Sequence, residues 1–299
     1  MLDLCIIGAP KCGTSSLFRW LTAHPEVVGP KSEKELFFFM DEGHPLMKRP
    51  NIHSESIESY RSLFPDSSFG RKIEGTTHYL YQSEARRCLS KMESSPLIVV
   101  IVRDPAERVW SSFQYTRNNL ARMSQEIYFS KYVDKMLSEK RDWVDEFVSH
   151  SGSAYVLKRD IDFSKYVEYL LNWREEVGRG RLLLFSFETL VSRPRATCQL
   201  LASTLNVDPK FYDDFDFEAQ NTTYGISSSV LHALARRVGR WVPDGRLKQV
   251  AKQTYMKIAT TEITRNRSQR QAIQRLKNHF HSYNKELARH FNIDISSWS

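Results

Sequence analysis

Six consecutive aliphatic residues at positions 97–102, Leu-Ile-Val-Val-Ile-Val, constrain the fold of this chain more than any other feature. The run has no polar alternation, which is typical of a strand that is buried on both faces in a parallel sheet. It ends at Arg103, far short of the roughly 18 apolar residues that a membrane-spanning helix needs. We therefore predict a strand at the centre of a parallel sheet and no transmembrane segment.

Shorter aliphatic runs alternate with helical patterns on either side of this run, which predicts βαβ units. The strand-like segments lie at residues 4–7, 72–76, 97–102 and 181–187. The helix-like segments lie at residues 15–24, 83–92 and 166–173 and begin again near residues 106 and 195. The sequence therefore predicts an α/β fold, a central parallel sheet flanked by helices.

The strand pattern stops after residue 205. Residues 207–229 predict a surface connection with short turns. Apolar residues at helical spacing in 229–241 and 269–291, with a turn sequence at 242–245 between them, predict a helical C-terminal region.

The composition indicates a folded protein, and the N-terminus favours a cytoplasmic location. With 299 residues, of which 41% are hydrophobic, we expect one domain over residues 1–299, made of an α/β core at 1–205 and a loop and helical region at 206–299. The N-terminus has no basic region before its short apolar run, so we expect no secretory signal peptide. The four cysteines form no CxxC pair, which disfavours a disulfide framework or a zinc site.

The net charge of +8 is concentrated at one end of the chain. Residues 232–290 contain 14 Lys and Arg but 3 Asp and Glu, so the rest of the chain is slightly acidic. A solvated helical face, nucleic acid, an acidic membrane surface and a multiply charged ligand are all compatible with such a segment. No zinc-finger spacing or RNP-type aromatic strand accompanies the charge, so we do not expect a nucleic-acid partner.

A glycine-containing loop at residues 8–15 follows the first predicted strand and opens a helix, the position in which backbone N–H groups bind phosphate. A Walker A loop carries Lys directly after its second Gly, where this chain has Thr14, and the only lysine here is Lys11. A Walker B strand delivers an Asp for Mg²⁺, whereas the run at 97–102 delivers Arg103. The loop thus predicts a P-loop-like, metal-free anion site, with an ordinary βα turn as the alternative.

A second candidate anion site begins where the central strand ends. Arg103 and Arg108 flank the start of the next helix, and Ser111 lies eight residues after Arg103. Ligands of open α/β sheets bind outside the carboxyl ends of the strands, so both sites should face one crevice. An Arg fork and a Ser hydroxyl suit a second phosphate, whereas the alternative is a salt-bridged helix start with Asp104 near the N-cap.

Together these motifs resemble the two phosphate-binding motifs of sulfotransferases that use 3'-phosphoadenosine 5'-phosphosulfate (PAPS). The resemblance rests on Pro-Lys-Cys-Gly-Thr-Ser-Ser-Leu at 10–17 and on Ile-Val-Arg-Asp-Pro-Ala-Glu-Arg-Val-Trp-Ser-Ser-Phe at 101–113. Residues 33–40 and 73–81 are similar to two segments of the carbohydrate and heparan sulfate sulfotransferases. The likeness continues at 166–194 and 287–298 and is weakest at 208–265.

The resemblance implies transfer of a sulfuryl group from PAPS to an acceptor hydroxyl, with 3'-phosphoadenosine 5'-phosphate (PAP) as product and no metal. It implies that the loop surrounds the 5'-phosphosulfate through Lys11, Cys12, Gly13, Thr14, Ser15 and Ser16. It also implies that Arg103 and Ser111 hold the 3'-phosphate. Lys11 would stabilise the negative charge on the departing phosphate.

Glu35 is the implied general base, because it holds the Glu position before the aromatic run at 37–39. Glu33 is an alternative, since two residues apart in an extended segment it would point to the same face. His78 is another, because the cytosolic sulfotransferases of small molecules use a His base. We expect a pocket role for His78, with a purely structural role equally open.

Three departures from the family pattern limit what carries over. Gly75 stands where many heparan-type members have a lysine near the sulfonate, so no second catalytic lysine is expected. Phe37 replaces a frequent His, which favours a less polar acceptor pocket. The loop that closes over adenosine has no clear match, and residues 221–229 are the nearest segment.

The expected function is sulfation of a hydroxyl, on a carbohydrate or glycoconjugate by the resemblance. A small secondary metabolite is the alternative acceptor, favoured by the aromatic run at 37–39 and by the absence of a membrane anchor. A nucleotide kinase is disfavoured by both departures from the Walker motifs, and a nucleic-acid-binding protein by the missing module.

Overall fold

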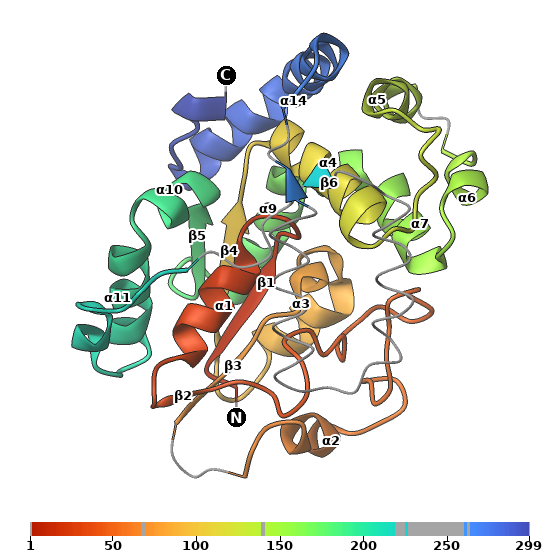
Figure 1. The fold of residues 1–299 in the computed structure, drawn as a ribbon. Helices are drawn as coiled ribbons and strands as arrows, with labels where there is room; N and C mark the ends of the chain where they lie inside the picture. Colours follow the sequence, from red (N-terminus) through yellow and green to blue (C-terminus); the bar gives the residue numbers. More distant parts are fainter. Residues whose placement is uncertain are drawn as a thin grey trace. The chain divides into compact units, whose positions relative to one another are not determined.

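Five parallel strands form the main sheet of the computed structural model, which describes residues 2–66, 70–138, 141–218, 225–226, 260–261 and 264–298 (Figure 1). The strands are β1 (Leu4–Gly8), β2 (Val27–Val28), β3 (Arg71–Glu74), β4 (Leu97–Val102) and β5 (Leu182–Ser186). Their order is β2-β3-β1-β4-β5, and all four pairings are parallel. The predicted α/β fold with a parallel sheet is therefore confirmed.

The middle position of the sheet belongs to β1, which corrects the prediction that residues 97–102 form the central strand. β4 lies between β1 and β5, and five of its six residues are buried. All five residues of β1 are buried as well. The two-residue strand β2 adds a position at the far edge, beyond β3, and its shortness left no strand signal in the sequence.

The helices that flank the sheet match the helical patterns in the sequence. They are α1 (Thr14–Thr22), α3 (Ser83–Ser90), α9 (Tyr166–Val177) and α11 (Pro194–Thr204). The helix predicted near residue 106 is α4 (Pro105–Gln114), which begins shortly after β4 ends. The chain crosses the sheet in one direction from β1 to β2 and in the other from β3 to β4. Because such crossovers are right-handed, α1 covers one face, where it packs against α11, and α3 packs against α9 on the other.

Several short elements lack a signal of their own in the sequence: α2 (Ile57–Ser62), α10 (Phe187–Ser192) and the 3₁₀ helices Thr77–Tyr81, Pro209–Tyr212 and Ser296–Trp298. The helix α10 follows β5 without a connection, and Ser186 caps it by accepting a hydrogen bond from the backbone N–H of Thr189 at 3.0 Å. After this strand the sequence predicted a single helix, which begins near residue 195. The chain forms two helices there, α10 and α11.

The chain divides into two compact units, each described by itself. The first comprises residues 1–108, 162–221 and 279–299 and contains the five-stranded sheet. The second comprises residues 109–161 and 222–278. It includes α5 (Phe129–Leu137), α6 (Val144–Phe147) and α7 (Ser151–Lys158). A single domain over residues 1–299 stays a prediction.

In the C-terminal third, one predicted helix is confirmed, and the prediction that no strand follows residue 205 is corrected. The helix α14 (Arg267–Phe291) covers the pattern at 269–291. Two short strands, β6 (Gly225–Ile226) and β7 (Thr260–Thr261), pair antiparallel, so the expectation of no strand after residue 205 is wrong. Two-residue strands with distant partners leave no periodic signal. The predicted helix at 229–241, the turn at 242–245 and most of the segment 221–229 lie outside the described residues.

Candidate functional site

The loop after β1 and the segment after β4 leave neighbouring strands at the same edge of the sheet. Gly8 lies opposite Val100 in the β1–β4 pairing, and the backbone N–H of Ala9 donates to the carbonyl oxygen of Ile101 at 2.8 Å. Because the two strands are parallel and adjacent, Lys11 and Arg103 follow them into one region of the first unit. Ligands of open α/β sheets bind outside the carboxyl ends of the strands. Two segments predicted to bind anions are therefore placed where they could contact one ligand.

The loop at residues 8–15 has the backbone shape of an anion-binding turn. Lys11 and Gly13 adopt positive φ angles of 71° and 84°, and α1 begins at Thr14 with no side-chain cap. Uncapped N–H groups at the start of α1 face out of the helix end. A Cβ on Gly13 would come within 3.0 Å of the Phe187 ring, so both the φ angle and the space require glycine there.

The side chain of Cys12 points into the core rather than out of the loop. It is fully buried, and its Sγ lies 3.8 Å from the hydroxyl of Tyr166. Burial raises the pKa of this thiol to about 11, so the thiol stays neutral and offers no charge to a ligand. The predicted donor-binding role of Cys12 thus concerns its backbone alone. Among its neighbours, Ser16 is buried and Ser15 half-buried.

Two cations dominate the electrostatics of the loop. Burial, and after it the nearby guanidinium of Arg103, lowers the pKa of Lys11 to about 7. Arg103 itself lies over the Phe187 ring at 4.6 Å and is 3.6 Å from a carboxylate oxygen of Glu107. An anion that contacts both side chains would offset the effect of Arg103 on Lys11 and favour the charged form of the lysine.

Ser111, the predicted partner of Arg103, lies on α4 in the second unit, where it is buried. Its pairing with Arg103 on a 3'-phosphate stays a prediction. Arg108, from the same motif, is fully buried, and its Nε donates to the hydroxyl of Ser164 at 2.8 Å. The guanidinium of Arg108 therefore supports the core beside the loop.

Glu35 lies next to the start of α1, although the two are distant in the sequence. One of its carboxylate oxygens accepts a hydrogen bond from the hydroxyl of Thr77 at 2.9 Å and is 3.3 Å from the Nζ of Lys34. The same Lys34 Nζ donates to the hydroxyl of Thr14 at 3.2 Å. The structure thus brings the predicted base and the predicted phosphate loop together through a lysine.

The two alternative bases lie in very different surroundings. Glu33 is at the surface, 56% exposed, with the Nζ of Lys48 at 2.6 Å. His78 is buried beside the rings of Phe37 and Phe163, and its Nδ1 has no hydrogen-bond partner in the described part of the chain. Burial lowers the pKa of His78 to about 4, so the ring is neutral at physiological pH and a weak base.

A buried polar network holds the segment that follows Glu35. The backbone N–H groups of Leu36 and Phe37 donate to the hydroxyl of Thr76 at 2.8 and 3.2 Å. That hydroxyl donates in turn to the carboxylate of Glu74 at 2.6 Å. Phe37 has a positive φ of 53°, which is strained for a bulky residue, so these hydrogen bonds support an unfavourable backbone conformation.

Sequence reasoning missed Lys34, Thr76 and Thr77 as members of the site. All three stand inside the segments that carry the family resemblance, but nothing in their spacing shows which way their side chains point. The absence of a lysine at position 75 predicted a site with one lysine. The structure instead places a second ammonium, that of Lys34, at the start of α1.

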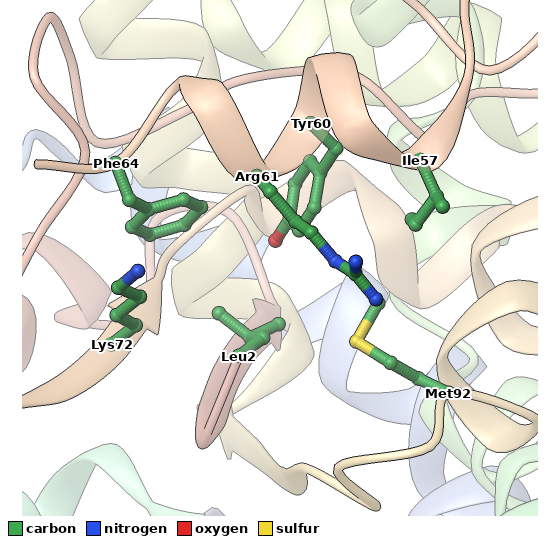
Figure 2. Close-up of a pocket in the computed structure, with 7 residues that line it drawn as sticks. All are labelled: Leu2, Ile57, Tyr60, Arg61, Phe64, Lys72 and Met92. Carbon is green, nitrogen blue, oxygen red and sulfur yellow. The ribbon is translucent and has the colours of Figure 1, made fainter. Parts of the chain in front are cut away.

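A pocket lies apart from this site. Figure 2 shows a pocket lined by Leu2, Ile57, Tyr60, Arg61, Phe64, Lys72 and Met92. Leu2 precedes β1, so this pocket is at the amino end of the strand, whereas the loop at residues 8–15 is at its carboxyl end.

No helix in the described ranges is long and apolar enough to cross a membrane. Among the same residues, no group of three His, Cys, Asp or Glu is placed to hold a metal ion.

Comparison with known proteins identifies the relatives of this chain. It is 25% identical over 244 residues to heparan sulfate glucosamine 3-O-sulfotransferase 5 of Mus musculus, which covers 80% of this chain and 64% of that protein. It is 25% identical over 214 residues to bifunctional heparan sulfate N-deacetylase/N-sulfotransferase 1 of Caenorhabditis briggsae, which covers 70% of this chain and 23% of that protein. The chain therefore spans less than two thirds of the length of either relative.

The fold and the family profile agree with these matches. The crystal structure of a sulfotransferase from Alicyclobacillus acidocaldarius has a TM-score of 0.66 to this chain at 19% identity, over 100% of this chain and 98% of that one, so the two share a fold. The family described as "Sulfotransferase domain" matches residues 2–223, which include every predicted site residue. The chain belongs to the sulfotransferase family.

Proposed function

We propose that this protein transfers a sulfuryl group from PAPS to a hydroxyl of an acceptor. The observation that carries the proposal is that Lys11 is close enough to Arg103 and to Glu35 for both charges to act on its pKa. The three residues supply two cations for an anionic donor and a carboxylate that can accept a proton. Glu35 is tied by Lys34 to Thr14, the first residue of the helix that opens from the loop.

The residues of the loop fit the donor's charged groups. The uncapped start of α1 and the ammonium of Lys11 would bind the 5'-phosphosulfate, and Arg103 with Ser111 would bind the 3'-phosphate. When bound, PAPS supplies an activated sulfuryl group. Lys11 is then needed in its charged form, which the negative charge of the donor favours by raising the pKa of that ammonium.

Glu35 is the proposed base. Its carboxylate is only 27% exposed, and the hydroxyl of Thr77 and the ammonium of Lys34 fix its position. Glu33 is turned to the surface and bound to Lys48, and the ring of His78 is buried and neutral. The surroundings of these three groups therefore favour Glu35.

The proposed acceptor is a hydroxyl of a carbohydrate or glycoconjugate, because the curated relatives are named for heparan sulfate. A small secondary metabolite is the second candidate. The observation that favours it is the aromatic setting of His78, whose ring lies among those of Phe37, Tyr81 and Phe163. Turnover of a panel of sugars and of phenols with PAPS separates the two classes. A cytoplasmic location stays a prediction.

The donor site is tested by thermal shift with PAP and with AMP, which differ at the 3'-phosphate. We expect PAP to raise the unfolding temperature clearly more than AMP, because a ligand stabilises the fold according to its affinity. Arg103→Ala should weaken PAP by about 1.5 to 3 kcal/mol, the scale of a hydrogen bond to a charged group, and leave AMP nearly unchanged. Arg87→Ala, which removes an exposed arginine on α3, is the control.

Equal shifts of the unfolding temperature with PAP and AMP would exclude the 3'-phosphate site.

A measurement with EDTA separates a sulfotransferase from a nucleotide kinase. We expect sulfuryl transfer to continue at nearly the same rate without divalent metal. Loss of transfer on chelation, restored by Mg²⁺, would favour the kinase.

A further inference from the structure

Lys34 lies between the donor side and the acceptor side of the site. Its Nζ is 3.2 Å from the hydroxyl of Thr14, at the start of the helix that faces the donor, and 3.3 Å from a carboxylate oxygen of Glu35, the proposed base. The side chain is 16% exposed, so the ammonium is held largely out of water. A cation in this position lies beside both the residue at the proposed donor site and the proposed base.

Gly75 gives Lys34 the space to reach this position. A Cβ at residue 75 would lie 2.9 Å from the Cγ of Lys34, closer than such atoms approach, and 3.1 Å from both the Cδ of Lys34 and a ring carbon of Phe18. The backbone N–H of Gly75 also donates to the carbonyl oxygen of Lys34 at 3.2 Å, which fixes the two segments against each other. The aliphatic part of Lys34 therefore occupies the place that a side chain at residue 75 would fill.

In-line transfer determines what such an ammonium can contact. As the bond between the acceptor oxygen and sulfur forms, the bond between sulfur and the phosphate oxygen breaks, and PAP leaves with that electron pair. The acceptor proton passes to Glu35. The three remaining sulfuryl oxygens lie around the line that joins the acceptor oxygen to the leaving oxygen. A cation beside both Thr14 and Glu35 adjoins that line from the side.

We propose that the ammonium of Lys34 contacts the oxygens of the sulfuryl group as it passes from donor to acceptor, which makes Lys34 a catalytic residue. This inference rests on the proposed PAPS-dependent function. Burial lowers the pKa of Lys34 while the Glu35 carboxylate opposes that effect, so the ion pair favours the charged form that the contact needs. Lys11 acts on the leaving phosphate, and Lys34 acts on the group in transit.

The contact predicts a difference between two ligands, because PAPS carries the sulfuryl group and PAP does not. Removing Lys34 alone would leave the Glu35 carboxylate without its cation, and that charge would itself repel PAPS. The comparison is therefore made between Glu35→Gln and the double variant Glu35→Gln/Lys34→Met. Because both variants lack the proposed base, PAPS should stay intact during the titration. Chromatography of the sample after the titration checks that no PAP has formed.

We expect Lys34→Met in this background to weaken PAPS binding about tenfold or more by calorimetry, and PAP binding less than twofold. Lys31→Met is the control, because the Nζ of Lys31 bonds the carbonyl oxygen of Ser62 at the surface. Equal loss of both ligands would place Lys34 on a phosphate and overturn the proposal. Unchanged binding of both would limit Lys34 to a structural ion pair and overturn it too.

Gly75→Ala gives a second test that keeps every charge. The added methyl group should displace Lys34, so kcat should fall about 10² to 10³-fold in Lys34→Met, the range for loss of one transition-state donor, and fall in the same direction in Gly75→Ala. The added methyl group also meets the ring of Phe18 at 3.1 Å, so the two ligands are compared here too. Gly75→Ala should weaken the binding of PAPS more than that of PAP, and an equal loss of both ligands would contradict the proposal.

Different results would overturn the proposed function and the proposed role of Lys34. A wild-type protein that binds neither PAP nor PAPS would exclude the proposed function. A wild-type protein that binds both and transfers sulfuryl groups, with Lys34→Met equally active, would exclude only the role of Lys34.

Discussion

The charge state of Lys11 depends on residues that the fold brings to it. Burial and Arg103 lower its pKa to about 7, so the ammonium is charged below that pH and neutral above it. Because the role proposed for Lys11, stabilising the leaving phosphate, needs the charged form, we expect kcat/KM to fall as the pH rises above about 7. A lysine of ordinary pKa would lose its charge only near pH 10. Since kcat/KM reports the free enzyme, its pH profile is the measurement.

The bound state and a substitution provide the controls for this prediction. An anionic donor raises the pKa of Lys11, so the fall in kcat should lie at higher pH than the fall in kcat/KM. Lys11→Arg keeps its charge throughout, so its kcat/KM should lack the fall, whatever its absolute rate. A fall at the same pH in Lys11→Arg would assign the titration to another group.

Glu35 and Glu33 form a matched pair for the assignment of the base. Glu35→Gln keeps the size of the side chain but cannot accept the acceptor proton, so we expect kcat to fall about 10² to 10⁴-fold. Binding of PAP should survive, because the loss concerns the transition state. Glu33→Gln, which removes a carboxylate that pairs with Lys48 at the surface, should have nearly wild-type turnover.

The opposite pattern would show that the base is misassigned. If Glu35→Gln keeps near wild-type turnover with a genuine acceptor while Glu33→Gln or His78→Ala loses it, the proton is taken elsewhere. The sulfotransferase family would still stand, because it rests on the match over residues 2–223.

At the scale of elements, the segment 35–39 is positioned by the polar network that follows β3. The hydroxyl of Thr76 accepts hydrogen bonds from the backbone N–H groups of Leu36 and Phe37, and both of these residues are buried. Thr76→Val keeps the shape but removes this acceptor, so we expect a loss of about 1 to 3 kcal/mol in the free energy of unfolding for each donor left without a partner. Urea denaturation measures the loss.

The same substitution should also lower kcat, because Glu35 adjoins the segment that loses its support. Thr76→Ser keeps the hydroxyl and is the control, and we expect it to restore most of the stability and the turnover. A Thr76→Val protein as stable and as active as wild type would show that the segment is held by packing instead.

The elements themselves differ in how visible they are in the sequence. Continuous apolar runs predicted β1 and β4, and apolar residues at helical spacing predicted α1 and α9. The pair β6–β7, the edge strand β2 and the helix α10 are two to six residues long. Such elements form because a partner or a capping side chain is present, and neither of these appears as a period in the sequence.

For the whole molecule, strand order is what assembles the site. Residues 8–15 and Arg103 approach each other because β1 and β4 are neighbours, although α1, β2, β3 and α3 intervene in the chain. The sequence motifs predicted that both segments bind anions, and the parallel sheet explains how they share an edge. The second unit contains Ser111, whose part in the donor site stays a prediction.

The sequence motifs alone determined the family. The sequence also determined the class of fold and the position of the glycine-containing loop, because turn residues and apolar patterns act on the chain within a few residues of themselves. The tertiary structure alone decided which charged groups meet. Glu33 and Glu35 are two residues apart, yet one binds Lys48 at the surface and the other faces Thr77 and Lys34. Lys34 reaches Thr14 because Gly75, forty-one residues later, has no side chain in its path. The direction of a side chain and its pKa depend on the atoms packed around it, and those atoms come from parts of the chain that no local pattern connects.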